Sequence, residues 1–143
     1  VNITEVVTSL LKEYIQNSKR ASEQLDIRLP HGNIWILAQE KILIRILCNL
    51  IDNALKYSTG DIMFYMWGES EYCHIQISNP SDYISDEELK SIFDLFYTKD
   101  EARIKSSGIG LYATRKLVIQ ISGDIQVNYE AGIFTVSIKL PLI

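Results

Sequence analysis

Hydrophobic residues recur with helical spacing in some segments of the chain and alternate with polar residues in others. Apolar residues three and four positions apart predict helices over residues 4–22, 39–57 and 108–121. An acidic first turn predicts a shorter helix over residues 85–95. Short apolar or alternating runs predict strands over residues 25–29, 33–37, 61–68, 72–78, 125–129 and 134–140.

Turn-forming residues indicate how these elements are connected. Residues 30–32, Pro-His-Gly, predict a hairpin between the first two strands, and residues 130–132 predict another between the last two. Thr4 is in position to be the N-cap of the first helix, and Gly60 offers a C-terminal cap for the helix over 39–57. Residues 98–107 are polar and lack periodicity, so we expect a mobile lid there.

The order of helices and strands predicts the fold class. Helices alternate with two hairpins rather than with strict βαβ units, which indicates a two-layer α/β sandwich with a mixed, mainly antiparallel sheet. The runs over 61–68 and 72–78 are rich in Ile, Tyr, Phe and Met and suit the centre of that sheet. We find no internal repeat, low-complexity tract or interdomain linker in the sequence.

Composition limits the classes of function. With 143 residues, of which 47% are hydrophobic and 22% charged, we expect one domain spanning residues 1–143. A net charge of −4 and no block of Lys or Arg favour neither nucleic acid nor direct membrane contact. No apolar run approaches the roughly 18 residues of a membrane span, and no signal peptide is recognisable, so we expect a soluble domain.

The cysteines and the first residue indicate the setting of the domain. Cys48 and Cys73 show no CxxC spacing, so we expect two reduced, buried side chains in a cytoplasmic compartment and no metal site built from them. Because the chain begins at Val1 and its elements start at once, we expect it to be a fragment of a longer protein.

The most informative residues lie within the helix over 39–57. At about 100° per residue, Asn49, Asn53 and Lys56 fall within roughly a 60° sector of one helical face. A carboxamide oxygen is a neutral hard ligand suited to Mg²⁺, and a neighbouring ammonium can neutralise phosphate charge. The stripe is therefore suited to a magnesium nucleotide, although an isolated pair of this kind also occurs where asparagines cap backbone or face water.

Residues 49–58, NLIDNALKYS, resemble the asparagine box of the catalytic, ATP-binding domain of sensor histidine kinases, which share a superfamily with gyrase, mismatch-repair and heat-shock chaperone ATPases. Residues 92–99, IFDLFYTK, resemble the phenylalanine box of that family, and residues 107–111, SGIGL, resemble its second glycine box. Between them, where the family has DxGxG, this chain has NPSDY at residues 79–83.

The resemblance implies a Bergerat-type ATP-binding fold, in which three helices cover one face of the sheet and the nucleotide lies between two of them under a lid. It implies ATP and Mg²⁺ as cofactors, with Asn53 as the metal ligand and Asn49 beside it. Nucleotide-binding residues implied by the family are Asn49, Asn53, Lys56, Tyr57, Asn79, Ser107, Gly108, Gly110 and Leu111. A tyrosine that merely closes the helix end is an equally good interpretation of Tyr57, and Arg45 fits an ordinary surface arginine.

The resemblance also bears on the reaction. ATP-hydrolysing relatives carry a glutamate base four residues before the metal-binding asparagine, where this chain has Asn49, which cannot accept a proton at neutral pH. Kinase chemistry is therefore favoured over ATPase chemistry. Neither His31 nor His74 lies in a phosphoacceptor motif, so we expect the acceptor on a helix of the same parent protein, a response regulator as partner, and a monomeric isolated domain.

The departure at residues 79–83 leaves a second hypothesis open. Asn79 stands where the family's aspartate binds the exocyclic amine of adenine, and its carboxamide can offer either an oxygen or an NH₂ group. We expect weaker base selectivity and a loss of about 1–2 kcal/mol of binding free energy. Asp82 is a substitute carboxylate by sequence alone, and Tyr83 is expected to crowd the base pocket. The alternative function is a non-catalytic module of this fold that regulates a partner protein.

Overall fold

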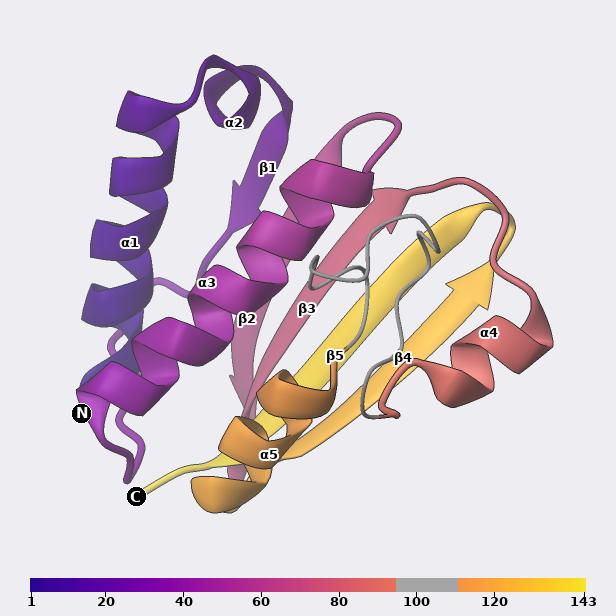
Figure 1. Cartoon of the computed structure of the whole chain (residues 1–143). Coiled ribbons are helices and arrows are strands. Elements are labelled where there is room, and N and C mark those ends of the chain that lie inside the picture. Colours follow the sequence, from indigo (N-terminus) through magenta and orange to yellow (C-terminus); the bar gives the residue numbers. More distant parts are fainter. Residues whose placement is uncertain (95–110) are drawn as a thin grey trace.

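The computed structural model describes residues 1–94 and 111–143, and within these ranges five strands form one sheet (Figure 1). They are β1 (Leu25–Arg28), β2 (Ile62–Glu69), β3 (Tyr72–Pro80), β4 (Asp124–Glu130) and β5 (Ile133–Pro141). Their spatial order is β1-β2-β3-β5-β4, and β1 pairs with β2 in parallel while the other pairs are antiparallel. The sheet is mixed and mainly antiparallel, as predicted.

One face of the sheet is covered by helices α1 (Ile3–Asn17), α3 (Glu40–Tyr57) and α5 (Tyr112–Gln120) (Figure 1). Helix α3 lies between the other two and contacts both. The described elements also include two short helices, α2 (Lys19–Gln24) and α4 (Asp86–Ser91). The predicted two-layer α/β sandwich with three helices on one face is confirmed.

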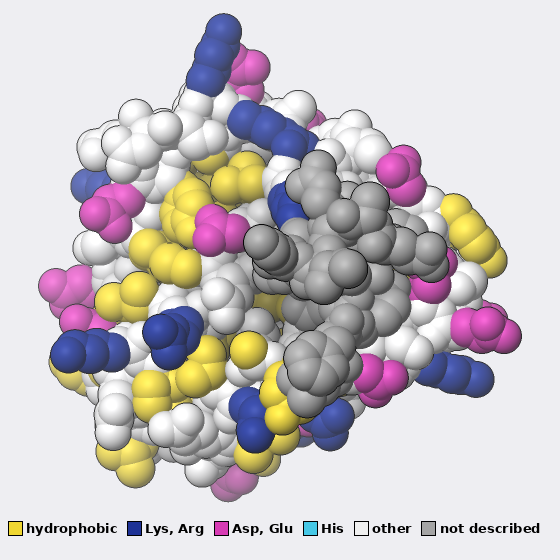
Figure 2. Space-filling model, in the orientation of Figure 1, with side chains coloured by type: hydrophobic (Ala, Val, Ile, Leu, Met, Phe, Trp, Pro, Cys, Tyr) yellow, Lys and Arg dark blue, Asp and Glu magenta, His cyan; other side chains and the backbone are white. Residues whose placement is uncertain are grey.

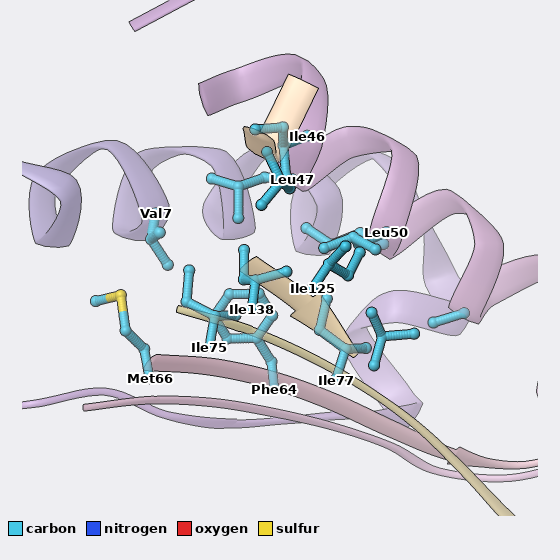
Figure 3. Packing of buried hydrophobic residues seen from close by; sticks show 14 of the residues in the cluster. Val7, Ile46, Leu47, Leu50, Phe64, Met66, Ile75, Ile77, Ile125 and Ile138 are labelled. Atoms are coloured by element: carbon cyan, nitrogen blue, oxygen red, sulfur yellow. The ribbon is translucent and has the colours of Figure 1, made fainter. Parts of the chain in front are cut away.

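The core lies between α1, α3 and the sheet. Side chains alternate along β3, so that its second, fourth and sixth residues are buried, as expected for a strand with one covered face. Leu47 and Leu50 of α3 pack over Phe64, Ile75 and Ile77 of the sheet (Figure 3). Burying each such side chain contributes about 1.5–3 kcal/mol, which fixes the position of α3 on the sheet.

Helix α3 agrees closely with the predicted range, and hydrogen bonds from another helix hold its C-terminal end. Its last carbonyls accept hydrogen bonds from Arg20 of α2, whose Nη1 donates to the oxygen of Leu55 and whose Nη2 donates to the oxygen of Ser58 at 2.6 Å. A cation at this end also complements the helix dipole. The helix ends at Ser58, which is extended, so the expectation that Gly60 caps it is wrong. Gly60 instead forms a tight turn with the Ser58 hydroxyl.

The predicted helix over residues 4–22 is two helices. Ser18 adopts an extended conformation, and its hydroxyl accepts a hydrogen bond from the amide of Ala21, so it ends α1 and caps α2. The N-cap of α1 is Asn2 rather than Thr4, because the Asn2 carboxamide accepts from the amide of Glu5. The Thr4 hydroxyl accepts from the amide of Ile34 and ties α1 to the segment after β1.

The predicted hairpin over residues 25–37 is also wrong. Strand β1 pairs in parallel with β2, from Leu25 opposite Ile62 to Arg28 opposite Tyr65. Residues 33–37 form no strand and make only isolated bridges, in which Trp35 pairs with Asn2 and Ile36 with Leu142. Alternation of side chains marks an extended segment, but it carries no information about the pairing partner.

The remaining connections agree with the sequence. The β2–β3 hairpin turns at Ser70, and the β4–β5 hairpin turns at Ala131 and Gly132, all three with positive φ.

Helix α4 begins after Ser85 with a capping box that involves Glu88, and it ends at Ser91, short of the predicted residue 95.

Both cysteines are free thiols. Cys73 is buried in β3, as expected, while Cys48 is only half-buried on α3. Burial raises the pKa of the Cys73 thiol to about 12, which keeps it protonated. The prediction of a buried side chain is therefore correct for Cys73 and only partly correct for Cys48.

Several predicted features lie outside the described residues. These are residues 95–99 of the phenylalanine-box segment, the expected lid over 98–107, and Ser107, Gly108 and Gly110. The predicted helix over 108–121 is described from residue 111 onward, where α5 begins at Tyr112.

Candidate functional site

The asparagine stripe of α3 lies along the side that faces α5. Asn49 donates from Nδ2 to the Thr114 hydroxyl at 3.3 Å, and Thr114 is buried in α5. Asn49 and Asn53 are both half-buried, one helical turn apart. The contact with Thr114 uses the NH₂ group of Asn49 and leaves the oxygen as the acceptor of the carboxamide. Sequence reasoning missed Thr114, because a threonine within a helical pattern carries no signal of its own.

The C-terminal half of α3 and the end of β3 enclose a small recess. Its polar lining comes from Asn53 and Tyr57 of α3 and from Asn79 of β3. The rest of the lining is apolar and consists of Leu50, Ala54, Ile77, Phe134 and Val136. The cavity volume is about 10 Å³, room for about one water molecule. Three predicted side chains, two from α3 and one from β3, therefore meet at one place.

Tyr57 brings an unsatisfied polar group to this recess. Its hydroxyl is buried and has no hydrogen-bond partner within residues 1–94 and 111–143. A buried hydroxyl without a partner costs about 1–3 kcal/mol, so a ligand or water that pairs with it would be favoured. Lys56 lies next to it, with Nζ 5.2 Å from the centre of the Tyr57 ring.

Asn79 lies at the inner edge of the recess because it falls on the buried side of β3 and is only 4% exposed. Its Nδ2 donates to the carbonyl oxygen of Pro80 at 3.1 Å. The same carbonyl accepts from the amide of Thr59 at 2.9 Å, which joins the end of β3 to the end of α3. The Pro80 carbonyl therefore holds Asn79 of β3 in place relative to the end of α3, which carries Asn53 and Tyr57.

Two sequence-based expectations about residues 79–83 are wrong. Tyr83 does not crowd the recess, since it is 73% exposed and its ring centre lies 6.2 Å from that of Tyr129. Asp82 is exposed and does not line the recess, so it is no substitute for a carboxylate at Asn79.

The structure describes the start of the phenylalanine box and the end of the glycine box, and these two parts of the chain are in contact. Leu111 is buried, is the N-cap of α5, and donates from its amide to the carbonyl oxygen of Ile92 at 2.8 Å. Phe93 lies beneath the guanidinium group of Arg115, 5.3 Å from its ring centre. Two motifs that are separated in sequence are thus joined next to α5, the helix that contacts Asn49.

A metal ion at this site would need ligands other than a cluster of His, Cys, Asp or Glu side chains. Within the described residues, no group of three or more His, Cys, Asp or Glu side chains is placed to hold one. The donors near the recess are the half-buried carboxamides of Asn49 and Asn53. Such a donor set fits Mg²⁺ that keeps waters and phosphate oxygens as its other ligands.

Comparison with known proteins decides the family. Residues 38–143 match the family described as histidine kinase-, DNA gyrase B-, and HSP90-like ATPase. The chain belongs to this family. The matched range contains α3 with both asparagines, the end of β3 with Asn79, and α5.

Named relatives are sensor proteins. The chain is 27% identical over 151 residues to the sensor protein RprX of Bacteroides fragilis (strain YCH46), with 100% of this chain and 29% of the relative covered. It is 27% identical over 147 residues to the sensor histidine kinase YcbM of Bacillus subtilis (strain 168), with 97% and 47% covered. The chain thus spans less than half the length of these relatives.

Solved structures share the fold. The mycobacterial sensor histidine kinase MprB superimposes with a TM-score of 0.81 at 21% identity, covering 99% of this chain and 95% of that one. The histidine kinase domain of the Escherichia coli osmosensor EnvZ gives a TM-score of 0.76 at 21% identity, covering 100% and 88%. These likenesses show the fold of the chain, and the family match over residues 38–143 shows that it belongs to the histidine kinase-, DNA gyrase B-, and HSP90-like ATPase family. Among the described helices, none is both long and apolar enough to cross a membrane.

Proposed function

We propose that residues 1–143 form one catalytic domain of a longer sensor histidine kinase, and that it binds Mg-ATP between α3, the end of β3 and α5. The observation that carries this proposal is the meeting of Asn53, Tyr57 and Asn79 around one recess. These are the residues that the family resemblance assigns to the metal, the base and its exocyclic amine. A further neighbour of this fold is full-length ShkA, whose crystal structure is a complex with AMPPNP.

The phosphate end of the nucleotide would lie along the asparagine stripe. Asn53 offers its carboxamide oxygen to the metal, and the bond from Asn49 to Thr114 at 3.3 Å holds the second carboxamide in place. A magnesium ion held there would supply positive charge to the phosphates of the nucleotide. Lys56 follows on the same side of α3 and can contribute a positive charge to the phosphates.

The base would enter the recess beside Tyr57. A volume of about 10 Å³ is far too small for a purine, so the lining side chains have to move apart on binding. The unpartnered Tyr57 hydroxyl would gain a partner in the process, which offsets part of the cost of opening. The base would then lie between the end of α3 and Asn79.

Asn79 gives this site a preference for adenine. Its NH₂ group donates to the carbonyl of Pro80 at 3.1 Å, which leaves the carboxamide oxygen as the acceptor for an exocyclic amine. A guanine carbonyl at the same place would face that oxygen and be repelled. We therefore propose that ATP binds more tightly than GTP, and more weakly than it would with a carboxylate at this position.

The reaction would be transfer of the γ-phosphate to a histidine outside this chain. A neutral imidazole nitrogen attacks phosphorus, a nitrogen–phosphorus bond forms, and the bond to the bridging oxygen breaks to leave ADP. No glutamate base is required, which agrees with an asparagine at position 49. His31 is exposed after a proline, and His74 stacks on Trp67 within the sheet at 5.0 Å between ring centres, so neither is the proposed acceptor.

The proposed partners follow from the relatives. They are the phosphoacceptor helix of the same parent protein and a response regulator, and we propose a cytoplasmic location and a monomeric isolated domain. The alternative is a non-catalytic module of the same fold that regulates a partner. Its support is the neutral Asn79, which removes a charged contact to the base.

Isothermal titration with ATP and Mg²⁺ tests the proposal. We expect saturable binding by the unaltered chain and none by Asn53→Ala. Asn33→Ala is the matched control, because Asn33 is exposed in the segment before α3, and it should bind normally. Equal binding by the Asn53 variant would refute the metal site, and no binding of ATP or ADP by the unaltered chain at millimolar concentration would favour the non-catalytic module.

A further inference from the structure

A groove separates α1 from the N-terminal half of α3, on the side of α3 away from α5. It has a cavity volume of about 500 Å³. Its apolar lining comes from Val6 and Leu10 of α1, Ile44 of α3 and Trp35 at one end. Figure 2 shows hydrophobic side chains reaching the surface over the side of the molecule on which α1 and α3 lie.

Trp35 is unusual for a surface residue of a small domain. Its backbone is fixed by a bridge to Asn2 and by a hydrogen bond from Ile143 at 3.1 Å, yet its side chain is 55% exposed. The neighbouring Leu37 is 82% exposed. A rigidly held, exposed tryptophan is typical of an anchor in a binding surface.

The rim of the groove is acidic. Glu5, Glu13 and Glu40 line it, and all three are exposed. No Lys or Arg lines this groove, whose lining belongs entirely to the described part of the chain.

The groove is distinct from the proposed nucleotide site. Glu40 and Ile44 lie about 140–180° around the axis of α3 from Asn49, as follows from about 100° per residue. An occupant of the groove and a nucleotide would therefore contact opposite sides of the same helix.

We propose that this groove binds a basic amphipathic helix of a partner protein. Helices α1 and α3 run in the same direction, since Tyr14 of α1 contacts Asp52 of α3 while Glu5 and Glu40 meet at the other end. Two such helices with an apolar groove between them accept a third helix through its apolar face. Glu5 and Glu13 are eight residues apart on α1, or about 12 Å along its axis, which matches Lys or Arg residues two turns apart on a bound helix. The apolar face of that helix packs on Trp35, Leu10 and Ile44.

The probe is a synthetic peptide of about 14 residues, roughly 21 Å as a helix, with leucines on one face and lysines beside them. The control peptide carries glutamate in place of every lysine. Binding is followed by the indole N–H signals of isotopically labelled protein, assigned with Trp35→Phe. We expect the lysine peptide to shift the Trp35 signal in a saturable way and to leave Trp67, on the opposite face of the sheet, unchanged. The glutamate peptide should shift neither.

Charge variants complete the test. Glu5→Gln, Glu13→Gln and Glu40→Gln together should weaken binding of the lysine peptide about tenfold, the effect of three ion pairs of ordinary surface strength. Three exposed glutamates elsewhere are changed to glutamine as the control with equal net charge, at Glu71, Glu87 and Glu130. That control should bind as the unaltered protein does.

Three results would overturn the proposal. One is equal affinity of the two triple variants for the lysine peptide, and another is a peptide-induced shift at Trp67 without one at Trp35. The third is self-association of the protein in sedimentation experiments that is strengthened by neutralising the groove glutamates, since this would assign the groove to a second copy of the chain.

Discussion

The variant Asn79→Asp places a carboxylate where the family has an aspartate. It should change nucleotide affinity and the free energy of unfolding in opposite directions. In Asn79→Asp, the NH₂ group that donates to the Pro80 carbonyl at 3.1 Å is replaced by an oxygen, in a position only 4% exposed. Loss of this hydrogen bond and burial of a charge should lower the free energy of unfolding without nucleotide by about 1–3 kcal/mol. Binding of ATP should nevertheless tighten about tenfold, because a carboxylate accepts from the adenine amine through a charge-assisted bond.

The stability effect has a predictable pH dependence. Burial raises the pKa of a carboxyl at position 79 in the folded state above its unfolded value of about 3.9. The folded variant then binds more protons than the unfolded chain, so its free energy of unfolding falls as pH rises through this range. Urea unfolding at pH 5 and pH 8 should therefore show a larger loss at pH 8.

Titrations of the unaltered chain and of Asn79→Asp with ATP and with GTP compare the base preference of the two proteins. We expect the ratio of ATP to GTP affinity to increase in Asn79→Asp. Asn128→Asp, an exposed change in β4 that alters the net charge by the same amount, serves as the control. If ATP binds no more tightly to the aspartate variant, or if GTP gains equally, Asn79 does not contact the exocyclic amine of the base.

Three further predictions concern the fold and the site. Gly123→Ala should cost about 1–3 kcal/mol in urea unfolding, because its Cβ would lie 2.7 Å from a leucine methyl group and 2.8 Å from a backbone carbonyl, whereas Gly32→Ala, with nothing within 4 Å, should cost far less. Thr114→Val removes the partner of Asn49 and should weaken Mg-ATP binding several-fold in calorimetry, with unchanged circular dichroism. Cys73, whose pKa burial raises to about 12, should react with a thiol reagent at pH 8 only at the rate of unfolding, and faster labelling of the folded chain would contradict its burial.

Helical periodicity was sufficient to predict the asparagine stripe of α3. The apolar residues of this helix bury one side, which forces Asn49 and Asn53 to the other and toward the neighbouring helix. That conclusion needs only local spacing, and it agrees with the structure. The position of Asn79 on the covered face of the sheet was not predicted, because the predicted strand ended at residue 78 whereas β3 continues to Pro80.

Features that depend on tertiary pairing could not be predicted. The strand over residues 25–28 has the alternation of a hairpin strand, but its partner, β2, lies more than 30 residues further along the chain. Arg20 caps the end of α3 from a different helix, and Thr114 orients Asn49 from α5. Such contacts produce no periodic pattern of residues in the sequence, because each one joins a single side chain to a distant backbone or hydroxyl group.

The position of the divalent metal is the most direct test of the account. Mn²⁺ replaces Mg²⁺ with AMPPNP in isotopically labelled protein, and the side-chain NH₂ signals of asparagine are assigned with Asn53→Ala, Asn49→Ala and Asn33→Ala. We predict that the paramagnetic ion broadens the Asn53 and Asn49 signals and leaves that of Asn33 unchanged. Sharp signals from Asn53 and Asn49 in the nucleotide complex, with broadening elsewhere, would contradict it.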